Sequence, residues 1–368
     1  MRTLYIGVMS GTSLDGVDAV LADFSTSGLR TLGHSSLPFS KALRHTLLEL
    51  NRSGSDELHV SALAANELAL LYAQVVQDLL HHTGYLPADI SAIGAHGQTV
   101  RHQPGLHDGI GYTLQINNPS LLAERTGIRV VADFRSRDIA AGGQGAPLVP
   151  AFHQHVFGAD GQTVAVLNVG GMSNLSILNN GQAAGFDCGP GNVLLDHWCQ
   201  LHTGQAFDRG GAWAAEGQVN PALLEHLMRE PFFKLPPPKS TGRDLFHAAW
   251  LNAALAACAP LTAVDVQASL TALTAQVCAE DVLRYAPHAA RLLVCGGGAY
   301  NLCLMQMLQQ RLPGIPVQST GEHGLPPLQV EAAAFAWLAR QTCLNLPGNL
   351  PAVTGAAGPR VLGAIYPA

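Results

Sequence analysis

The stretch TLYIGVMSGTSLDGVDAVLADF, residues 3–24, predicts the fold of the first part of the chain. Its two apolar runs, Thr3–Met9 and Val17–Phe24, are typical of β-strands, and a third strand is expected over residues 28–39. The turn Gly11–Asp18 carries Gly, Ser, Thr and Asp, so its backbone N–H groups can face one anion. It lacks the G-K-[ST] of a Walker A loop, and a plain Asp-Gly hairpin is the alternative.

A second turn of this kind, Gly170–Asn174, follows the apolar run Val164–Val169. Strands are expected over 163–169, 174–178 and 182–186. A Gly-Gly hairpin explains this turn equally well when it is taken alone. Two such turns in two halves of one chain favour a pair of phosphate loops, and hence ATP.

The order of the expected elements occurs twice. In each half three strands come first, and helices then alternate with further strands. In the first half the expected helices are 58–82 and 118–126, and the further strands are 90–95 and 128–132. In the second half the expected helices are 193–202, 267–285, 301–311 and 328–340, and the further strands are 291–295 and 316–318. We therefore expect two duplicated α/β domains, 1–135 and 136–348, with a cleft between them. The tail 349–368 is a candidate addition to the first domain. Residues 135–150 predict a crossover or hinge, and Phe232–Arg243 predicts a long surface loop.

Composition excludes several classes of protein. Hydrophobic residues make up 48% of the 368 residues and charged residues 12%, with a net charge of −6, which argues against a disordered chain or a nucleic-acid-coating protein. The three lysines, Lys41, Lys234 and Lys239, form no basic run. No segment reaches the about 20 apolar residues of a membrane span, and the 7 cysteines show no zinc spacing. We expect a cytoplasmic protein that binds neither nucleic acid nor membrane.

Asp187 is the candidate general base. It is the only carboxylate between Asp160 and Asp196, and it lies where an expected strand ends among glycine-bearing turns. A lone carboxylate at such a junction can accept a proton in catalysis. The alternative is a turn or helix-capping aspartate.

Four further positions carry candidate binding groups. The run Cys295–Ala299 contains three glycines that leave a flat backbone for adenine or ribose. A Rossmann turn, G-x-G-x-x-G, is the alternative, but in the window Gly296–Asn301 its last glycine is missing. His96 and Arg135 each follow a buried strand, and Arg135 can bind a carboxylate with two hydrogen bonds or form a structural ion pair. Glu331, near a helix start, either binds sugar hydroxyls or favours the helix dipole.

Together these motifs resemble the anhydro-N-acetylmuramic acid kinase family over essentially the whole chain. The stretches that carry the resemblance are Gly11–Asp18, His96–Thr99, Asp133–Arg135, Gly142–Leu148, Asn168–Asn174, Phe186–Asn192, Cys295–Asn301, Leu325–Glu331 and Val353–Ala356. The resemblance implies a fold like that of hexokinase, actin and the heat-shock chaperone ATPases, with two ribonuclease H-like domains flanking an ATP cleft. It also implies a homodimer.

The resemblance implies one coupled reaction. ATP, water and 1,6-anhydro-N-acetylmuramic acid give N-acetylmuramic acid 6-phosphate and ADP in cell-wall recycling, with Asp187 as the base that activates water. It implies Mg²⁺, whose waters Asp15 and Asp18 would orient, and sugar binding by His96, Arg135 and Glu331. The implied ATP-binding residues are Gly11, Thr12, Ser13, Leu14, Asp15, Gly16, Val17, Asp18, Gly170, Gly171, Ser173, Asn174, Gly296 and Gly297.

One departure and three alternatives accompany the resemblance. Cys188 stands where the family commonly has Thr, which puts a local hydroxyl contact in doubt but leaves the base in place. A kinase of the same fold for another sugar is one alternative. A non-catalytic or chaperone-like ATPase is another, and Asp187 argues against it. A nicotinamide oxidoreductase would need the first turn to open into a helix, which the strand pattern of Val17–Phe24 opposes.

Overall fold

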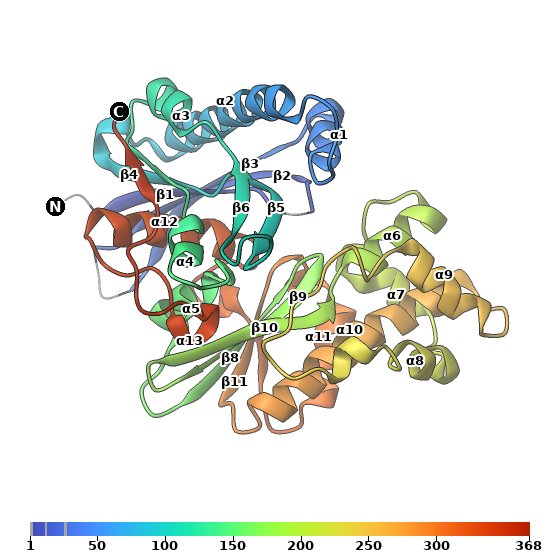
Figure 1. The fold of residues 1–368 in the computed structure, drawn as a ribbon. Helices are drawn as coiled ribbons and strands as arrows, with labels where there is room; N and C mark the ends of the chain where they lie inside the picture. The colour runs from blue at the N-terminus through green and yellow to red at the C-terminus, as the bar shows by residue number, and fades with distance from the viewer. Residues whose placement is uncertain (1–2, 12, 26–27) are drawn as a thin grey trace. The chain divides into compact units, whose positions relative to one another are not determined.

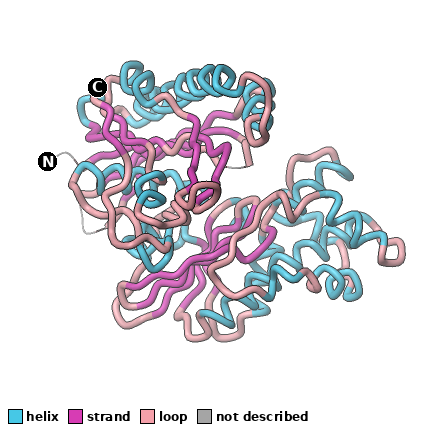
Figure 2. The backbone as a smooth tube through the Cα atoms, in the orientation of Figure 1, coloured by secondary structure: helices cyan, strands magenta, loops and turns pink. Residues whose placement is uncertain are grey.

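The computed structural model describes residues 3–11, 13–25 and 28–368, so Thr12 of the first predicted phosphate loop lies outside the described residues. The chain forms two compact units, one made of Met1–Val156 with Gln329–Ala368 and the other of Phe157–Leu328. Residues 136–156 and 329–348, which the sequence assigns to the second domain, thus lie in the first unit, as does the tail 349–368. Figure 1 shows the elements in chain order, and Figure 2 shows helices alongside the strands of each unit.

The first unit is built on a six-stranded sheet of order β13-β7-β4-β1-β2-β3. Strands β1, β2 and β3 form an antiparallel meander, and β4 and β7 continue parallel to β1. The strands of this unit are β1 (Leu4–Met9), β2 (Gly16–Asp23), β3 (Arg30–Pro38), β4 (Ile90–Ala95), β5 (Gln98–Pro104), β6 (Gly111–Ile116), β7 (Val130–Ala132) and β13 (Ala364–Tyr366). Its helices are α1 (Lys41–Glu49), α2 (Glu57–Thr83), α3 (Pro119–Thr126), α4 (Ser136–Ala140), α5 (Val149–Phe157, which ends at the unit boundary), α12 (Val330–Cys343) and α13 (Pro351–Thr354).

The second unit repeats this arrangement with a five-stranded sheet of order β10-β9-β8-β11-β12. Its first three strands are again an antiparallel meander, and β11 and β12 run parallel to β8. The elements are β8 (Thr163–Val169), β9 (Met172–Asn179), β10 (Gln182–Pro190), α6 (Val193–Thr203), α7 (Ala212–Glu216), α8 (Pro221–Leu227), α9 (Ala248–Ala256), α10 (Ala263–Tyr285), β11 (Arg291–Cys295), α11 (Leu302–Arg311) and β12 (Val317–Ser319). The duplicated α/β fold expected from the sequence is confirmed.

Alternation along β1 sets the packing of the first unit. Ile6 and Val8 point to one face of the sheet and pack in the core that includes Leu68 and Val75 of α2. Gly7 points to the opposite face, where a methyl group would overlap the backbone carbonyl of Ala332 in α12. The backbone of α12 therefore lies directly against the face of the sheet, and this contact fixes the first turn of α12 over β1.

Replacing Gly7 with alanine is expected to lower the free energy of unfolding by about 1–3 kcal/mol, because the added methyl group must displace the helix backbone. Urea unfolding measures the change. Gly54→Ala is the matched control, since a methyl group at Gly54 meets no atom within 4 Å. Equal unfolding midpoints for the two variants would contradict the packing described for α12.

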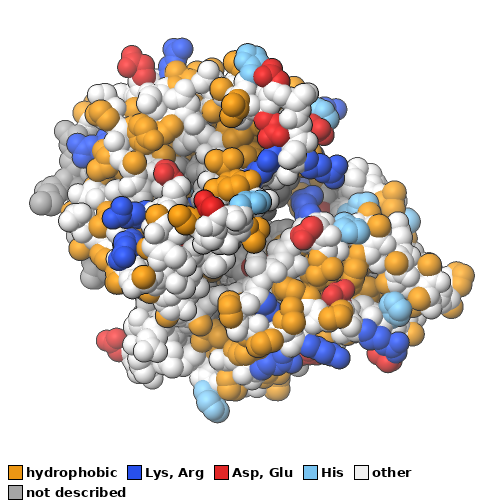
Figure 3. Space-filling model, in the orientation of Figure 1, with side chains coloured by type: hydrophobic (Ala, Val, Ile, Leu, Met, Phe, Trp, Pro, Cys, Tyr) orange, Lys and Arg blue, Asp and Glu red, His pale blue; other side chains and the backbone are white. Residues whose placement is uncertain are grey.

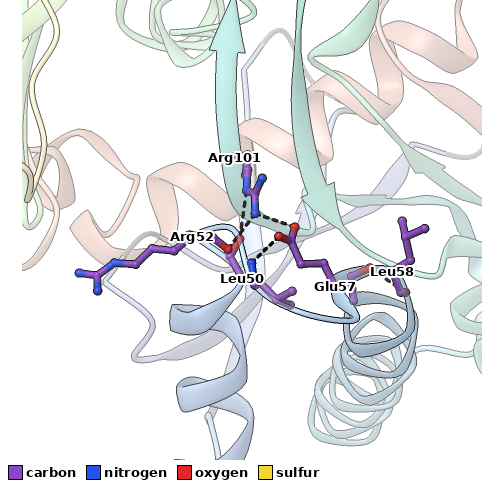
Figure 4. A network of polar contacts seen from close by, with 7 residues as sticks. Leu50, Arg52, Glu57, Leu58 and Arg101 are labelled. Carbon is purple, nitrogen blue, oxygen red and sulfur yellow. Dashed lines mark hydrogen bonds and ion pairs between the residues drawn. The ribbon is translucent and has the colours of Figure 1, made fainter.

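An arginine fastens the chain between the first two helices of this unit. Arg101 of β5 donates to the carbonyl of Arg52 over 2.8 Å and pairs with Glu57 over 2.6 Å, as Figure 4 shows. Its Nε donates to the carbonyl of Leu50 over 3.4 Å. The β5–β6 hairpin and helix α1, neither of which the sequence predicted, are joined by this network.

The stretch 135–150 is anchored in the first unit by Asp138, which has no exposed surface. Asp138 accepts from the side chains of Asn349 over 2.6 Å and Thr354 over 2.7 Å, and from the Gly145 N–H over 2.8 Å. The hydrogen bonds from Asn349 and Thr354 join this glycine-rich stretch to the C-terminal tail.

The expected surface loop at Phe232–Arg243 is wrong in part. Phe232 and Phe233 are each 6% exposed and pack in the core of the second unit, and Lys239 is 7% exposed. The run of prolines suggested a solvent-exposed loop, but Phe232 and Phe233 pack in the hydrophobic core and bury this part of the segment.

The surface carries both signs of charge. On the face shown in Figure 3, Lys and Arg side chains are interspersed with Asp and Glu among apolar and uncharged residues. None of the helices in the described part of the chain combines the length and apolar character that a membrane crossing requires.

Candidate active site

In the second unit, polar side chains form one row at the sheet edge where β8, β10 and β11 end. Asn168 of β8 lies opposite Asn174 of β9, and Asn174 lies opposite Asp187 of β10. Directly opposed residues on neighbouring strands place their side chains on the same face, and all three are half-buried. This row brings two amides and one carboxylate together, and sequence reasoning did not single out Asn168.

Asp187 is held by three consecutive residues of the 239–241 segment. Its carboxylate oxygen Oδ2 accepts from the Ser240 hydroxyl over 2.8 Å and from the Thr241 N–H over 3.0 Å. Its own N–H donates to the Lys239 carbonyl over 3.1 Å. Both carboxylate contacts go to Oδ2, and no hydrogen bond from a described residue reaches Oδ1.

Burial raises the pKa of Asp187 above its ordinary value. The hydrogen bonds from Thr241 and Ser240 and the charge of Lys239 act in the opposite direction without cancelling the effect of burial. A carboxylate with a raised pKa is a stronger base than an ordinary aspartate, and the free Oδ1 is the oxygen that can take a proton.

The predicted nucleotide-binding backbone of this unit converges near the same sheet edge. The carbonyl of Gly170 accepts from the Asn192 N–H over 2.8 Å, and the Asn192 side chain donates to the Val169 carbonyl over 3.1 Å. A methyl group on Gly297 would lie 3.4 Å from the Asn192 side chain, and one on Gly296 would press on the Asn168 side chain. The turn at 170–171 and the glycines at 296–297 are therefore neighbours, with Asn192 joining them.

Ser173 has a structural partner in this unit. Its side chain is fully buried, and its hydroxyl donates to the Gly189 carbonyl over 3.1 Å. Asn174, the other side chain predicted in this turn, lies half-buried in the row with Asp187.

Cys188, which follows the candidate base, points away from it into the core. Its side chain is fully buried beside Cys278 and Asp281 of α10, and its thiol has a pKa raised by a hydrogen bond with Cys278 and by burial. The thiol also forms a hydrogen bond with Asp281. Burial raises the pKa of the Asp281 carboxyl, and this hydrogen bond acts in the opposite direction. The contacts of the Cys188 side chain are thus with α10.

In the first unit, the predicted sugar-binding residues lie at the edge where β1, β4 and β7 end. Arg135 donates from Nε to Nε2 of His96 over 3.2 Å, with its Nη2 at 3.0 Å from the same nitrogen, and from Nη1 to the Gly145 carbonyl over 2.9 Å. Burial, followed by the charge of Arg135, holds the pKa of His96 well below its ordinary value. His96 is therefore neutral, with Nε2 as the acceptor.

Glu331, in the first turn of α12, completes this group. Burial and the charge of Asp18 raise its pKa, and the charge of Arg135 lowers it. Burial lowers the pKa of Arg135 to about 10, against the opposing effects of Glu331 and Asp138. The close packing of α12 on Gly7 is what places Glu331 near Arg135 and Asp18.

The turn after β1 is partly described. Leu14, at φ 58°, is buried, and its N–H donates to the Gly11 carbonyl over 3.2 Å. Asp15 is exposed, while Asp18 bonds His34 over 2.9 Å. Thr12 lies outside the described residues.

The structure also shows which functional candidates the sequence missed. Lys239, Ser240 and Thr241 contact Asp187 although they follow it by more than fifty positions in the chain. The only available signal was that Lys239 is one of three lysines in the sequence, and the proline-rich context suggested a surface loop.

The family model described as "Anhydro-N-acetylmuramic acid kinase" matches residues 3–368. A protein of that name from Variovorax paradoxus is 62% identical over 371 residues, covering 99% of each chain. One from Cupriavidus pinatubonensis is 58% identical over 367 residues, covering 99% of this chain and 98% of the relative.

Solved structures are much more distant. A ROK family glucokinase from Streptomyces griseus, in complex with glucose and AMPPNP, is 14% identical with a TM-score of 0.42, covering 92% of this chain and 99% of the glucokinase chain. At this distance the likeness says nothing about activity. The match of the family model over nearly the whole sequence, and the relatives at 62% and 58% identity, show that this chain belongs to the anhydro-N-acetylmuramic acid kinase family.

Proposed function

We propose that the chain opens 1,6-anhydro-N-acetylmuramic acid with water and phosphorylates O6 at the expense of ATP. The products are N-acetylmuramic acid 6-phosphate and ADP. Family membership supports the substrate and the kinase activity. The single observation that carries the mechanism is Asp187, a half-buried carboxylate with a raised pKa. The 239–241 segment holds one of its oxygens, and the other accepts no hydrogen bond from the residues that the structure describes.

The reaction balances around this carboxylate. Asp187 Oδ1 takes a proton from water as the water oxygen bonds C1 of the sugar, and the C1–O6 bond breaks. O6 then takes the γ-phosphoryl group, ADP leaves, and the proton on Asp187 passes to solvent. Positioned acid–base groups of this kind contribute about 10²- to 10⁴-fold to the rate.

ATP would be held by backbone groups of the two predicted phosphate loops. In the second unit the turn at 170–171 and the glycines at 296–297 lie together, with Asn192 joining them. In the first unit Gly11, Ser13, Leu14, Asp15, Gly16, Val17 and Asp18 form the described part of the other turn. No lysine-bearing P-loop is present in the sequence, so backbone N–H groups would stabilise the charge on the phosphates.

Mg²⁺ fits this arrangement as an ion carried mainly by the nucleotide. The described residues contain no group of three or more His, Cys, Asp or Glu side chains that could hold a metal ion. Mg²⁺ in kinases usually keeps several waters and binds one or two carboxylates plus phosphates, a requirement that Asp15 and Asp18 can meet. When bound, the ion would neutralise charge that develops on the transferred phosphoryl group.

The sugar would be bound by His96, Arg135 and Glu331. The Arg135 guanidinium suits a substrate carboxylate, which N-acetylmuramic acid carries, and the neutral His96 orients it. We further propose, on family resemblance, that the chain works as a homodimer in the cytoplasm.

The test is ATP turnover with purified 1,6-anhydro-N-acetylmuramic acid, with open-ring N-acetylmuramic acid and glucose as comparison substrates. ADP formed only with the anhydro sugar supports the proposal. Turnover with another sugar identifies a related kinase, and turnover independent of any sugar identifies a chaperone-like ATPase; either result contradicts it.

The acidic limb of kcat/KM is expected above the ordinary aspartate range of about 4. The reason is that Asp187 must be ionised to accept a proton, and burial raises its pKa, so activity is lost at a higher pH as the solution is acidified. A pH–rate profile of the wild-type enzyme measures this limb. A profile that stays level down to about pH 4 would contradict the assignment of Asp187 as base.

A further inference from the structure

A buried ion pair lies directly behind the segment that holds Asp187. Lys239 Nζ is 3.0 Å from Asp281 Oδ2 of α10, and the two side chains are only 1% and 3% exposed. The same ammonium lies over the rings of Phe186 and Phe232, at 5.6 Å and 5.3 Å from their centroids. Lys239 is thus fixed on three sides inside the second unit.

The connection from this pair to Asp187 is short. The Lys239 carbonyl accepts from the Asp187 N–H, and the next two residues, Ser240 and Thr241, donate to Asp187 Oδ2. Ser240 is itself exposed, so it has little packing of its own to hold it in place. The anchor of the segment is therefore Lys239, and the anchor of Lys239 is a long buried helix.

Stability alone does not account for such a pair. Removing two charges from water costs as much as their attraction gains, and replacing a buried pair by apolar residues is often neutral or stabilising. The pair is then expected to contribute to the position of the 239–241 segment and to the electrostatic field at Asp187. The charged or titratable groups around Asp187 are Lys239 on the segment, with Asp281, Cys278 and Arg284 of α10 and the neighbouring Cys188 acting around the pair.

We propose that Lys239 and Asp281 are positioning residues for Asp187: the pair fixes the 239–241 segment, and the segment holds Oδ2 so that Oδ1 faces the attacking water. This proposal rests on the proposed function of Asp187 as base. The charge of Lys239 also favours the ionised form of Asp187, the form that can accept a proton.

The first test variant is the double substitution Lys239→Met with Asp281→Leu, which removes both charges and keeps apolar volume. We expect it to unfold at nearly the wild-type temperature, while kcat falls about 10- to 100-fold because the base is misplaced. The KM for ATP is expected to stay the same. Lys234→Met is the matched control, since Lys234 is an exposed lysine near the same segment and is expected to leave kcat unchanged.

The second readout needs no turnover. The Asp187 carboxyl is titrated by carbon-13 NMR, with its signal assigned by loss in Asp187→Asn. The double variant is expected to titrate at a higher pH than wild type, because the favourable charge of Lys239 is gone. Asp281→Asn, which keeps Lys239 but leaves its charge unopposed, is expected to titrate at a lower pH.

Opposite shifts in these two variants, with reduced kcat in the double variant, support a positioning role. Unchanged titration of Asp187 in both variants overturns it, even if either variant is less stable, and so does wild-type kcat in a folded double variant. If the wild-type enzyme fails to turn over the anhydro sugar, the proposed function is wrong. The two titrations then still decide whether the pair acts on Asp187.

Discussion

Asp187→Asn is expected to lower kcat by about 10²- to 10⁴-fold, the contribution of a positioned general base. Asparagine has nearly the same shape as aspartate, and its amide oxygen can still accept from the Ser240 hydroxyl and the Thr241 N–H. Lys239 keeps its partner Asp281, so no buried charge is left without a partner. The variant is thus expected to fold normally and to bind ATP, and steady-state kinetics with the anhydro sugar measures the loss.

The control for this variant is Asp244→Asn, because Asp244 is an exposed aspartate shortly after the segment that holds Asp187. It is expected to retain wild-type kcat. Near-normal kcat in Asp187→Asn would remove this residue as the base. An equal loss in both variants would point to a general effect of charge.

Arg135→Met is expected to lower kcat/KM for the sugar by about 10- to 150-fold, with a smaller effect on the KM for ATP. The range follows from hydrogen bonds to charged groups, which contribute about 1.5–3 kcal/mol each. Methionine fills much of the same volume but cannot donate to a substrate carboxylate or to His96. Initial rates at varied sugar concentration give the ratio.

The same variant has a second consequence. Arg135 lowers the pKa of Glu331, so its removal is expected to raise that pKa further and to move sugar-dependent activity to higher pH. Arg137→Met is the control, since Arg137 is an exposed arginine in the neighbouring helix α4. An unchanged kcat/KM in Arg135→Met would limit Arg135 to a structural role beside His96 and Gly145.

The sequence predicted the elements whose signals are local. Strands β1, β2, β8 and β9 were found because alternation and glycine turns lie within about ten residues of one another. Helix α11 begins where expected because Asn301 caps it by accepting from the Leu304 N–H over 2.9 Å. The repetition of element order then indicated the duplicated fold.

The missed features depend on contacts between distant parts of the chain. Lys239 meets Asp281 across 42 positions, and Asp138 meets Asn349 across 211 positions. Neither pair leaves a periodic pattern in the sequence, because the two partners lie on segments that are far apart along the chain. For the same reason the stretch Phe232–Arg243 was interpreted as a surface loop, although Phe232, Phe233 and Lys239 are buried.

The candidate site shows the same division. Asp187, His96, Arg135 and Glu331 could be selected from residue type and position after a strand or near a helix start, and the structure places the last three near one another. The partners that tune Asp187 could not be selected in this way. The free Oδ1, the hydrogen-bonded Oδ2 and the raised pKa all follow from the packing of the 239–241 segment.

The coupling of ring opening to phosphorylation is tested most directly in ¹⁸O-labelled water. The enzyme is incubated with ATP and 1,6-anhydro-N-acetylmuramic acid, and the 6-phosphorylated product is examined by mass spectrometry and carbon-13 NMR immediately after it forms. The mechanism predicts one ¹⁸O atom at C1 and none in the phosphoryl group. A 6-phosphorylated product without label at C1, or with label in the phosphate, would contradict it.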